Sequence, residues 1–215
     1  MNKIIIYLTI SDILILSAFG LIAPIFAIFM NTGITGGSIA AAGLASTIFF
    51  LVKSITQLPL SMYIDSRKGK LGFLLFGSFL IVLVPIIYAF SPNVKFIFIA
   101  QGIYGLGAAM AYPAWYSLFT MHLDRKHRGL EYSVWSTGVG LGIALTAYLG
   151  AKFVEISSFK ILFFIVAGLS FLGLIVLLFL SKRFLKDISK TEDLFMKEIG
   201  KTSLSFRKSI KEHKK

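Results

Sequence analysis

Cysteine is absent from this sequence, and charged residues are scarce. Without cysteine the chain has no disulfides, no thiolate metal ligands and no thiol redox chemistry. Its charged fraction of 15% lies well below the roughly 25% of a soluble domain. The three histidines lie at a span edge, in a loop and in the tail, which excludes an intramembrane Ser/His centre: His122, His127 and His213. We therefore predict that the chain is not an enzyme and holds no metal or other cofactor.

Six long apolar runs dominate the chain. About 20 helical residues cross the roughly 30 Å hydrocarbon core of a bilayer, and each run is about that long or longer. Open strands are excluded because lipid offers no partner to free backbone groups, and the alternating pattern of a barrel is missing. We predict an all-α, polytopic membrane protein with a bundle of six transmembrane helices. The predicted spans are Ile4 to Phe29, Ile39 to Met62, Leu71 to Phe90, Phe96 to Met121, Tyr132 to Val154 and Phe159 to Leu180.

The short loops alternate between those with little or no charge and those rich in Lys and Arg. The first loop, NTGITGGS, has no charge, whereas the second and fourth each carry three Lys or Arg residues. The third and fifth loops together carry Lys95, Lys152 and Lys160. By the positive-inside rule, this pattern predicts a multi-pass protein of the cell membrane with both termini in the cytoplasm. The net charge of +12 is then an insertion signal, and nucleic acid is not a predicted partner.

The residues after the last span have a different composition. We predict a transmembrane domain over residues 1–182 and a basic cytoplasmic tail over residues 183–215. In the tail, Phe184, Ile188, Phe195 and Ile199 fall near one helical face with lysines around the rest. Two interpretations stay open, a helix lying on the anionic inner leaflet and a solvated tail.

The six spans differ in polarity. The third and sixth contain no charge and almost no polar group, so they can face lipid. The other four hold polar or aromatic side chains that need an interior or a cavity. The predicted substrate pathway consists of Asp12, Lys53, Gln57, Gln101, Tyr104, Trp115 and Trp135.

Asp12 and Lys53 are the ionisable pair of this set. A charged side chain inside a membrane costs about 2.5 to 3.5 kcal/mol on insertion scales, so each should have a partner or a function. Both lie at similar depth from the cytoplasmic end of consecutive spans, and a lysine stem can cover the difference. We expect the two to meet. They would either fix the register of two helices or respond to a substrate or proton in a cavity.

Small residues predict where helices approach closely. Gly105 and Gly107 lie in the fourth span, and Gly138 and Gly142 in the fifth are four residues apart. Such spacing allows two backbones to come near each other in a membrane. These four glycines are the predicted packing positions.

The turn between the second and third spans, PLSMYIDSRKGK, combines Asp65 with Arg67, Lys68 and Lys70. Its order of an acid, bases and Gly69 resembles the signature loop of the major facilitator superfamily. A second stretch, QGIYGLG, resembles that family's fourth-helix pattern, with Gln101 where the family has Arg. Gly138 and Gly142 match its glycine-rich fifth helix, where Ile143 replaces a proline. The resemblance covers about residues 4 to 182 and corresponds to the N-terminal six-helix half of such a transporter.

The resemblance implies a function and a missing partner. It implies transport of a small solute by alternating access between two six-helix halves, in which Asp65 and the bases around it latch the cytoplasmic side. The bilayer and a small-molecule substrate are then the expected partners. The second half would be a second copy of the chain, as a homodimer, or another polypeptide. The alternatives are a truncated remnant without transport, or a regulatory or assembly subunit whose tail binds lipid or protein.

Overall fold

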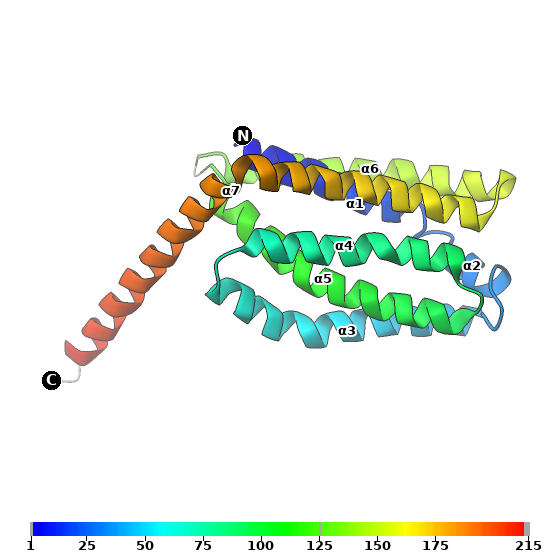
Figure 1. Cartoon of the computed structure of the whole chain (residues 1–215), viewed down its shortest axis with the longest axis horizontal. Helices are drawn as coiled ribbons and strands as arrows, with labels where there is room; N and C mark the ends of the chain where they lie inside the picture. Colours follow the sequence, from blue (N-terminus) through cyan, green and yellow to red (C-terminus); the bar gives the residue numbers. More distant parts are fainter. Residues whose placement is uncertain (1, 125, 213–215) are drawn as a thin grey trace.

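The computed structural model describes residues 2–124 and 126–212, with side chains up to residue 197. The described chain is helical apart from its connections, and six of its helices are long and apolar enough to cross a membrane, as predicted. They lie side by side, and the last one runs on beyond the bundle (Figure 1). The helices are α1 (Lys3–Gly20), α2 (Phe26–Thr32), α3 (Ile39–Ser66), α4 (Lys70–Phe90), α5 (Val94–His122), α6 (Arg128–Ile156) and α7 (Phe159–Glu212).

The first predicted span is not one helix. It divides into α1 and the short helix α2, with a turn between Gly20 and Phe26. Pro24 lies in this turn, and a proline removes one backbone donor and pushes against the carbonyl four residues earlier, which belongs to Gly20. Pro59, Pro85 and Pro113 sit inside α3, α4 and α5 without ending them. The prediction of a continuous helix from Ile4 to Phe29 is therefore wrong at this point.

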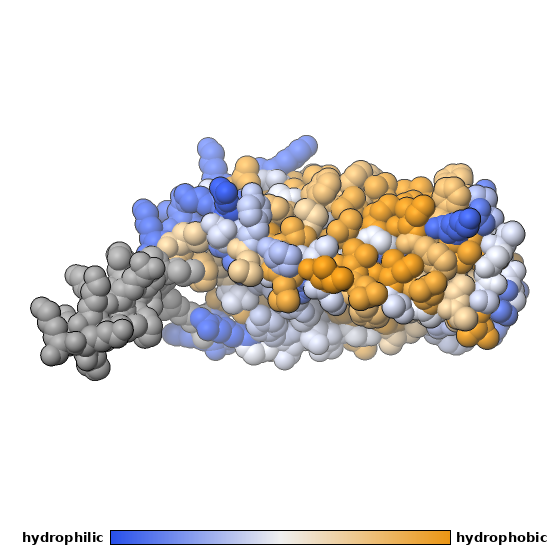
Figure 2. All heavy atoms as spheres, turned by 90° about the horizontal axis from the view of Figure 1, so that it is seen from below, coloured by the Kyte–Doolittle hydropathy of each residue, from blue (hydrophilic) through white to orange (hydrophobic). Residues whose placement is uncertain are grey.

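The loops that are rich in Lys and Arg gather at one end of the bundle. The N-terminus, the α3–α4 turn, the α5–α6 loop and the extension of α7 share one end, called the basic end below (Figure 1). Hydrophobic side chains cover much of the middle of the molecule, and hydrophilic ones gather towards its two ends (Figure 2). This distribution suits a protein that crosses a bilayer along the bundle axis. That the basic end faces the cytoplasm stays a prediction.

The apolar third and sixth spans, α4 and α7, are buried over about half of their most apolar stretches. Half of the most apolar stretch of α4 is buried and 44% of that of α7, against 11% for α3 and 6% for α6. The central helix α5 packs against α3 and α4, while α7 packs against α1 and α4. Both helices also carry exposed apolar side chains, among them Phe76 and Phe79 on α4 and Phe171 and Phe179 on α7, so lipid contact of these spans stays a prediction. The more polar α3 and α6 are the ones left uncovered.

The predicted glycines lie where helices touch. A Cβ on Gly105 would come 2.8 Å from the carbonyl oxygen of Phe49 on α3, and one on Gly107 would come 2.8 Å from that of Gly77 on α4. Gly138 and Gly142 of α6 face Ile13 and Ser17 of α1. These four positions thus mark three helix contacts, those of α5 with α3, of α5 with α4, and of α6 with α1.

Helix α7 does not break where the tail was predicted to begin. It continues through residue 183 to Glu212. Part of the apolar face predicted for the tail packs on the bundle, because Ile188 is 1% exposed and the Phe184 ring lies 5.8 Å from that of Tyr7 on α1. Ile199 lies outside the residues with described side chains. Binding of this tail to lipid stays a prediction.

Candidate functional site

A cleft of about 330 Å³ opens among α1, α3, α5 and α6, and we call it the main cleft. Its walls are largely polar or aromatic, which is unusual for a position inside a membrane bundle. It contains five of the seven predicted pathway residues. Its lining consists of Asp12, Leu16, Lys53, Gln57, Tyr112, Trp115, Tyr116, Trp135 and Val139.

Two tryptophans hold the acidic side of the main cleft in place. Trp135 on α6 donates its indole N–H to Oδ2 of Asp12 at 2.7 Å. Trp115 on α5 donates to the carbonyl oxygen of Leu8 at 3.2 Å, and the two indole rings lie 4.8 Å apart. Each tryptophan thus satisfies its polar N–H while presenting an apolar face. The carboxyl group of Asp12 is oriented by α6 and leaves its second oxygen for other partners.

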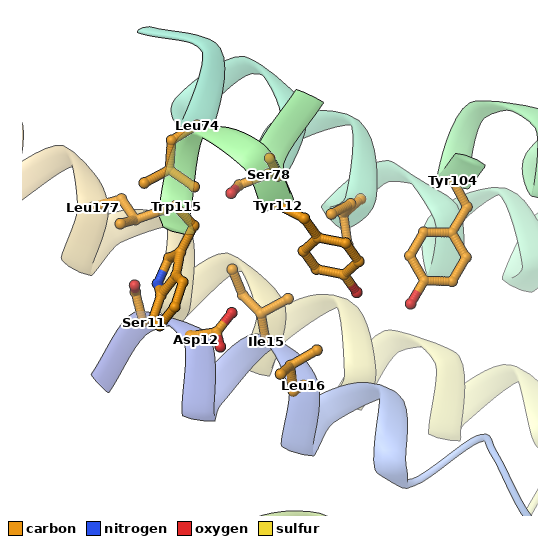
Figure 3. A pocket seen from close by; sticks show the side chains of 12 residues that line it. Ser11, Asp12, Ile15, Leu16, Leu74, Ser78, Tyr104, Tyr112, Trp115 and Leu177 are labelled. Carbon is orange, nitrogen blue, oxygen red and sulfur yellow. The ribbon is translucent and has the colours of Figure 1, made fainter. Parts of the chain in front are cut away.

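Figure 3 shows the same carboxyl group from the inner side. Asp12 lies between Trp115 and Ile15 on α1, and the hydroxyl groups of Tyr112 and Tyr104 point towards that helix. The enclosed space among these side chains and Ser78 measures about 20 Å³. A cavity of that size accommodates about one water molecule. The acid therefore borders the main cleft on one face and a closely packed interior on the other.

The predicted contact between Asp12 and Lys53 is not formed. Lys53 Nζ lies over the ring of Tyr112, 4.5 Å from its centroid, and 5.8 Å from that of Phe49. The carboxylate of Asp12 instead accepts a hydrogen bond from the indole N–H of Trp135. The first and second spans were expected to be direct neighbours, but α1 packs mainly on α7 and α6, and α3 packs mainly on α5. The two ionisable groups therefore lie in one cleft with separate partners.

Replacing Lys53 with methionine is expected to change the free energy of unfolding by less than about 1 kcal/mol, the scale of a cation–π contact. Removing one member of a buried ion pair would instead cost about 3–5 kcal/mol. Thermal unfolding of the purified chain in detergent distinguishes the two values, with Lys152→Met, at an exposed ion pair with Glu155, as the matched control. A loss of several kcal/mol in Lys53→Met alone would mean that the lysine has an ionic partner.

Gln101 and Tyr104 line a second cleft instead, also of about 330 Å³. We call it the aromatic cleft. The Tyr104 ring stacks on that of Phe19 at 4.8 Å and lies tilted against that of Phe49 at 4.4 Å, both measured between ring centroids. Gln101 and Tyr104 therefore lie outside the main cleft, and their part in a substrate pathway stays a prediction. The lining consists of Phe19, Ile22, Ala23, Phe26, Ser46, Phe49, Phe50, Tyr88, Gln101 and Tyr104.

Sequence reasoning left Tyr112 and Tyr116 out of the pathway, although both line the main cleft. The spacing of these tyrosines along the sequence could have indicated that they line the same cleft. Tyr112 and Tyr116 are one helical turn apart, and Tyr104 lies two turns before Tyr112, so all three fall near one face of α5. Phe19 and Phe49 carried no such signal, because aromatic residues are common throughout these spans.

The predicted latch residues meet at the basic end. Lys70 Nζ lies 3.9 Å from Asp65 Oδ1, and Lys68 Nζ lies 2.5 Å from Asp193 Oδ1 on α7. The hydrogen bond to Asp193 raises the pKa of Lys68. Arg67 stacks over the ring of Tyr63 at 5.2 Å. Asp65 itself is exposed and lines a groove of about 510 Å³ together with Pro113, Tyr116, Ser117, Thr120, Met121 and Phe195.

The structure is that of a membrane protein with transporter architecture. It has six membrane-length helices, a polar cleft between them, and a turn at one end that carries both acidic and basic side chains. The chain belongs to the Major Facilitator Superfamily, whose family model matches residues 8–214. This membership confirms the resemblance drawn from the turn and from the glycines.

Relatives and a solved structure agree with this membership. The chain is 26% identical over 186 residues to the multidrug resistance protein MdtG of a Rahnella species, covering 85% of this chain and 45% of the relative. It is 27% identical over 197 residues to MdtG from a strain of Escherichia coli, covering 90% and 48%. A crystal structure of a variant of the peptide transporter POT with alafosfalin superposes with a TM-score of 0.75 at 18% identity, over 96% of this chain and 46% of that one. The chain thus spans about half the length of the proteins it matches, and the POT likeness concerns the fold alone.

Proposed function

We propose that the chain is one six-helix half of an alternating-access transporter, and that its main cleft binds a small amphipathic solute. The main cleft carries this proposal. It places an acid and a base, Asp12 and Lys53, in the lining of one cavity, where each contacts a different aromatic side chain and the two form no ion pair. Placing an ionisable side chain inside a membrane is costly. Because Asp12 and Lys53 do not compensate each other, we infer that they bind the polar or charged parts of a ligand.

The aromatic side chains favour an amphipathic solute over a purely polar one. Trp115, Trp135, Tyr112 and Tyr116 supply broad apolar surfaces next to Asp12. Aromatic faces bind apolar rings and attract cations, whereas the acid would orient a donor or a positive group. The name of the MdtG relatives, multidrug resistance protein, fits a solute of this kind.

A second six-helix half would complete this cleft. Helices α3 and α6 contribute Lys53, Gln57 and Trp135 to its walls, and they are the least buried of the six. A second bundle resting on these two helices would cover the main cleft from its open side. In transporters of two related halves, the substrate lies at the interface of the halves. The partner would be a second copy of this chain or another polypeptide segment.

Tryptophan fluorescence provides a direct test. The sequence has two tryptophans, and both line the main cleft. We expect a saturable change in emission when the purified chain in lipid nanodiscs is titrated with lipophilic cations. Trp135→Phe and Trp115→Phe would assign the signal, and dipeptides and sugars would serve as comparison solutes. If neither emission nor transport responds to any of these classes, the transport proposal fails and a regulatory or assembly role replaces it.

The oligomeric state tests the second half separately. A species near twice the 23.8 kDa chain mass in native mass spectrometry would support a homodimer. A monomer that gains solute binding only when a second six-helix segment is co-expressed would support a heterologous partner. A monomer that binds and transports solute by itself would overturn the need for a second half.

A further inference from the structure

The aromatic cleft lies where the first span is interrupted. Helices α1 and α2 are separated by the turn that contains Pro24. Phe19 before this turn and Phe26 after it both line the cleft. Helix α3 supplies Ser46 and Phe49 to the same lining. Since α2 lies at the end of the bundle away from the basic end, the aromatic cleft is found towards that end (Figure 1).

The aromatic cleft differs from the main cleft in charge. Among the described residues that line it, none is acidic or basic, and the two clefts share no lining residue. A cation would gain only about 0.5–2 kcal/mol from the face of an aromatic ring. That gain does not compensate for moving a charge out of water without an opposite charge beside it. The lining of the aromatic cleft therefore favours an uncharged ligand.

Gln101 brings a polar group into this apolar surrounding. The residue is 6% exposed, and its side-chain amide has no hydrogen-bond partner within the part of the chain that the structure describes. An amide offers two donors and one acceptor oxygen. Leaving a buried polar group without a partner costs about 1–3 kcal/mol. The position of Gln101 in the lining thus indicates a ligand that supplies the missing hydrogen bonds.

Tyr88 on α4 adds a second hydrogen-bonding group. It is 4% exposed, and its hydroxyl group also lacks a partner among the described residues. Its ring lies 5.9 Å from that of Phe26 between centroids, so the polar groups stand among aromatic walls. The volume of about 330 Å³ is at the lower end for small-molecule pockets, which suits a molecule of about two fused rings.

We propose that the aromatic cleft is a second ligand site, which binds a small, uncharged aromatic molecule with an amide or carbonyl group, and that Gln101 orients this group by hydrogen bonds. The site is independent of the acid and the base in the main cleft. It goes beyond the transport proposal, because binding to it can be measured without any flux.

Equilibrium dialysis with naphthamide, an uncharged two-ring carboxamide, tests the site. We expect saturable binding to the purified chain in lipid nanodiscs, with empty nanodiscs as the measure of partition into lipid. Gln101→Leu keeps an apolar side chain of similar size and removes the amide, so affinity should fall about five- to tenfold, the scale of one lost hydrogen bond. Thr47→Val is the matched control, because Thr47 is exposed on α3 and lines neither cleft.

A second pair of variants separates blocked binding from loss of fold. Ser46 is exposed and lines the aromatic cleft, so the ring in Ser46→Phe should occupy the space of the ligand and weaken binding at least about tenfold. Thr47→Phe places the same ring one residue further along α3, outside the lining, and should bind naphthamide with unchanged affinity. The thermal midpoints of all variants are measured in parallel.

The cation naphthylmethylammonium, which carries the same two rings, distinguishes the two clefts. We expect it not to displace naphthamide, because the clefts share no lining residue. Displacement, equal naphthamide affinity in folded Gln101→Leu and Ser46→Phe, or no saturable binding to the unchanged chain would each overturn the proposal. If naphthamide binds as expected while no lipophilic cation alters tryptophan emission, the aromatic site stands and the proposed function of the main cleft fails.

Discussion

Asp12→Asn is expected to lower solute binding and transport about 10- to 100-fold, the scale of one lost charge-assisted hydrogen bond. Asparagine keeps an oxygen that can accept the indole N–H of Trp135, which Asp12 accepts at 2.7 Å. The substitution therefore removes the acid without removing its contact to α6. The thermal midpoint should change little, because the change leaves the packing of α1 as it is.

The measurement for this variant is solute affinity by tryptophan emission, together with flux in proteoliposomes. Glu155→Gln is the matched control, since it removes an acid that forms an exposed pair with Lys152 away from the cleft. Equal affinity for a cationic solute in Asp12→Asn and in the unchanged chain would show that the acid has only a structural role. Reduced affinity in both variants would point to a general effect of lost negative charge.

Gly150→Ala is expected to destabilise the chain by about 2 kcal/mol, in the range measured for overpacked contacts. A Cβ at Gly150 on α6 would collide with the backbone carbonyl group of Leu21, directly after α1, and a carbonyl cannot rotate away as a side chain does. The glycine is required here for space, since its backbone is helical. We expect a lower thermal midpoint and a smaller folded fraction after purification.

Gly140→Ala provides the comparison on the same helix. A Cβ at Gly140 would have no neighbour within 4 Å, so this substitution should leave stability unchanged or raise it by up to about 1 kcal/mol through helix propensity. Thermal unfolding in detergent with size-exclusion profiles would measure both variants. Equal midpoints for the two alanine variants would contradict the close contact between Gly150 and Leu21.

The contrast between Asp12 and Lys53 shows where sequence reasoning succeeded. Both side chains were identified as unusual because ionisable groups in apolar spans are rare and costly, and both line the main cleft. The prediction that they contact each other was wrong, because neighbouring spans in the sequence were assumed to be neighbouring helices in space. Trp135, 123 residues from Asp12, became the partner because α1 packs against α6.

Glu192 shows the opposite case. In the sequence it is one acid in a charged tail, and no local pattern marks it as buried. It is buried because α7 continues past the predicted end of its span and brings the carboxylate to the uncapped start of α4. Such a contact depends on the length and direction of a helix, which hydropathy does not specify.

The sequence by itself determined the class of protein and its six membrane-length helices, and it marked the rare polar side chains within them. Lipid offers no hydrogen-bond partner to unpaired backbone groups, and it makes buried charges costly. Hydropathy therefore identifies the membrane-spanning helices, and rare polar side chains within them indicate an interior or a cavity. Only the tertiary structure decided which helices are covered, which of the polar and aromatic side chains line the main cleft, and which partners Asp12 and Lys53 take. Those choices follow from helix packing, where small differences in shape and spacing select among neighbours that are chemically almost equivalent.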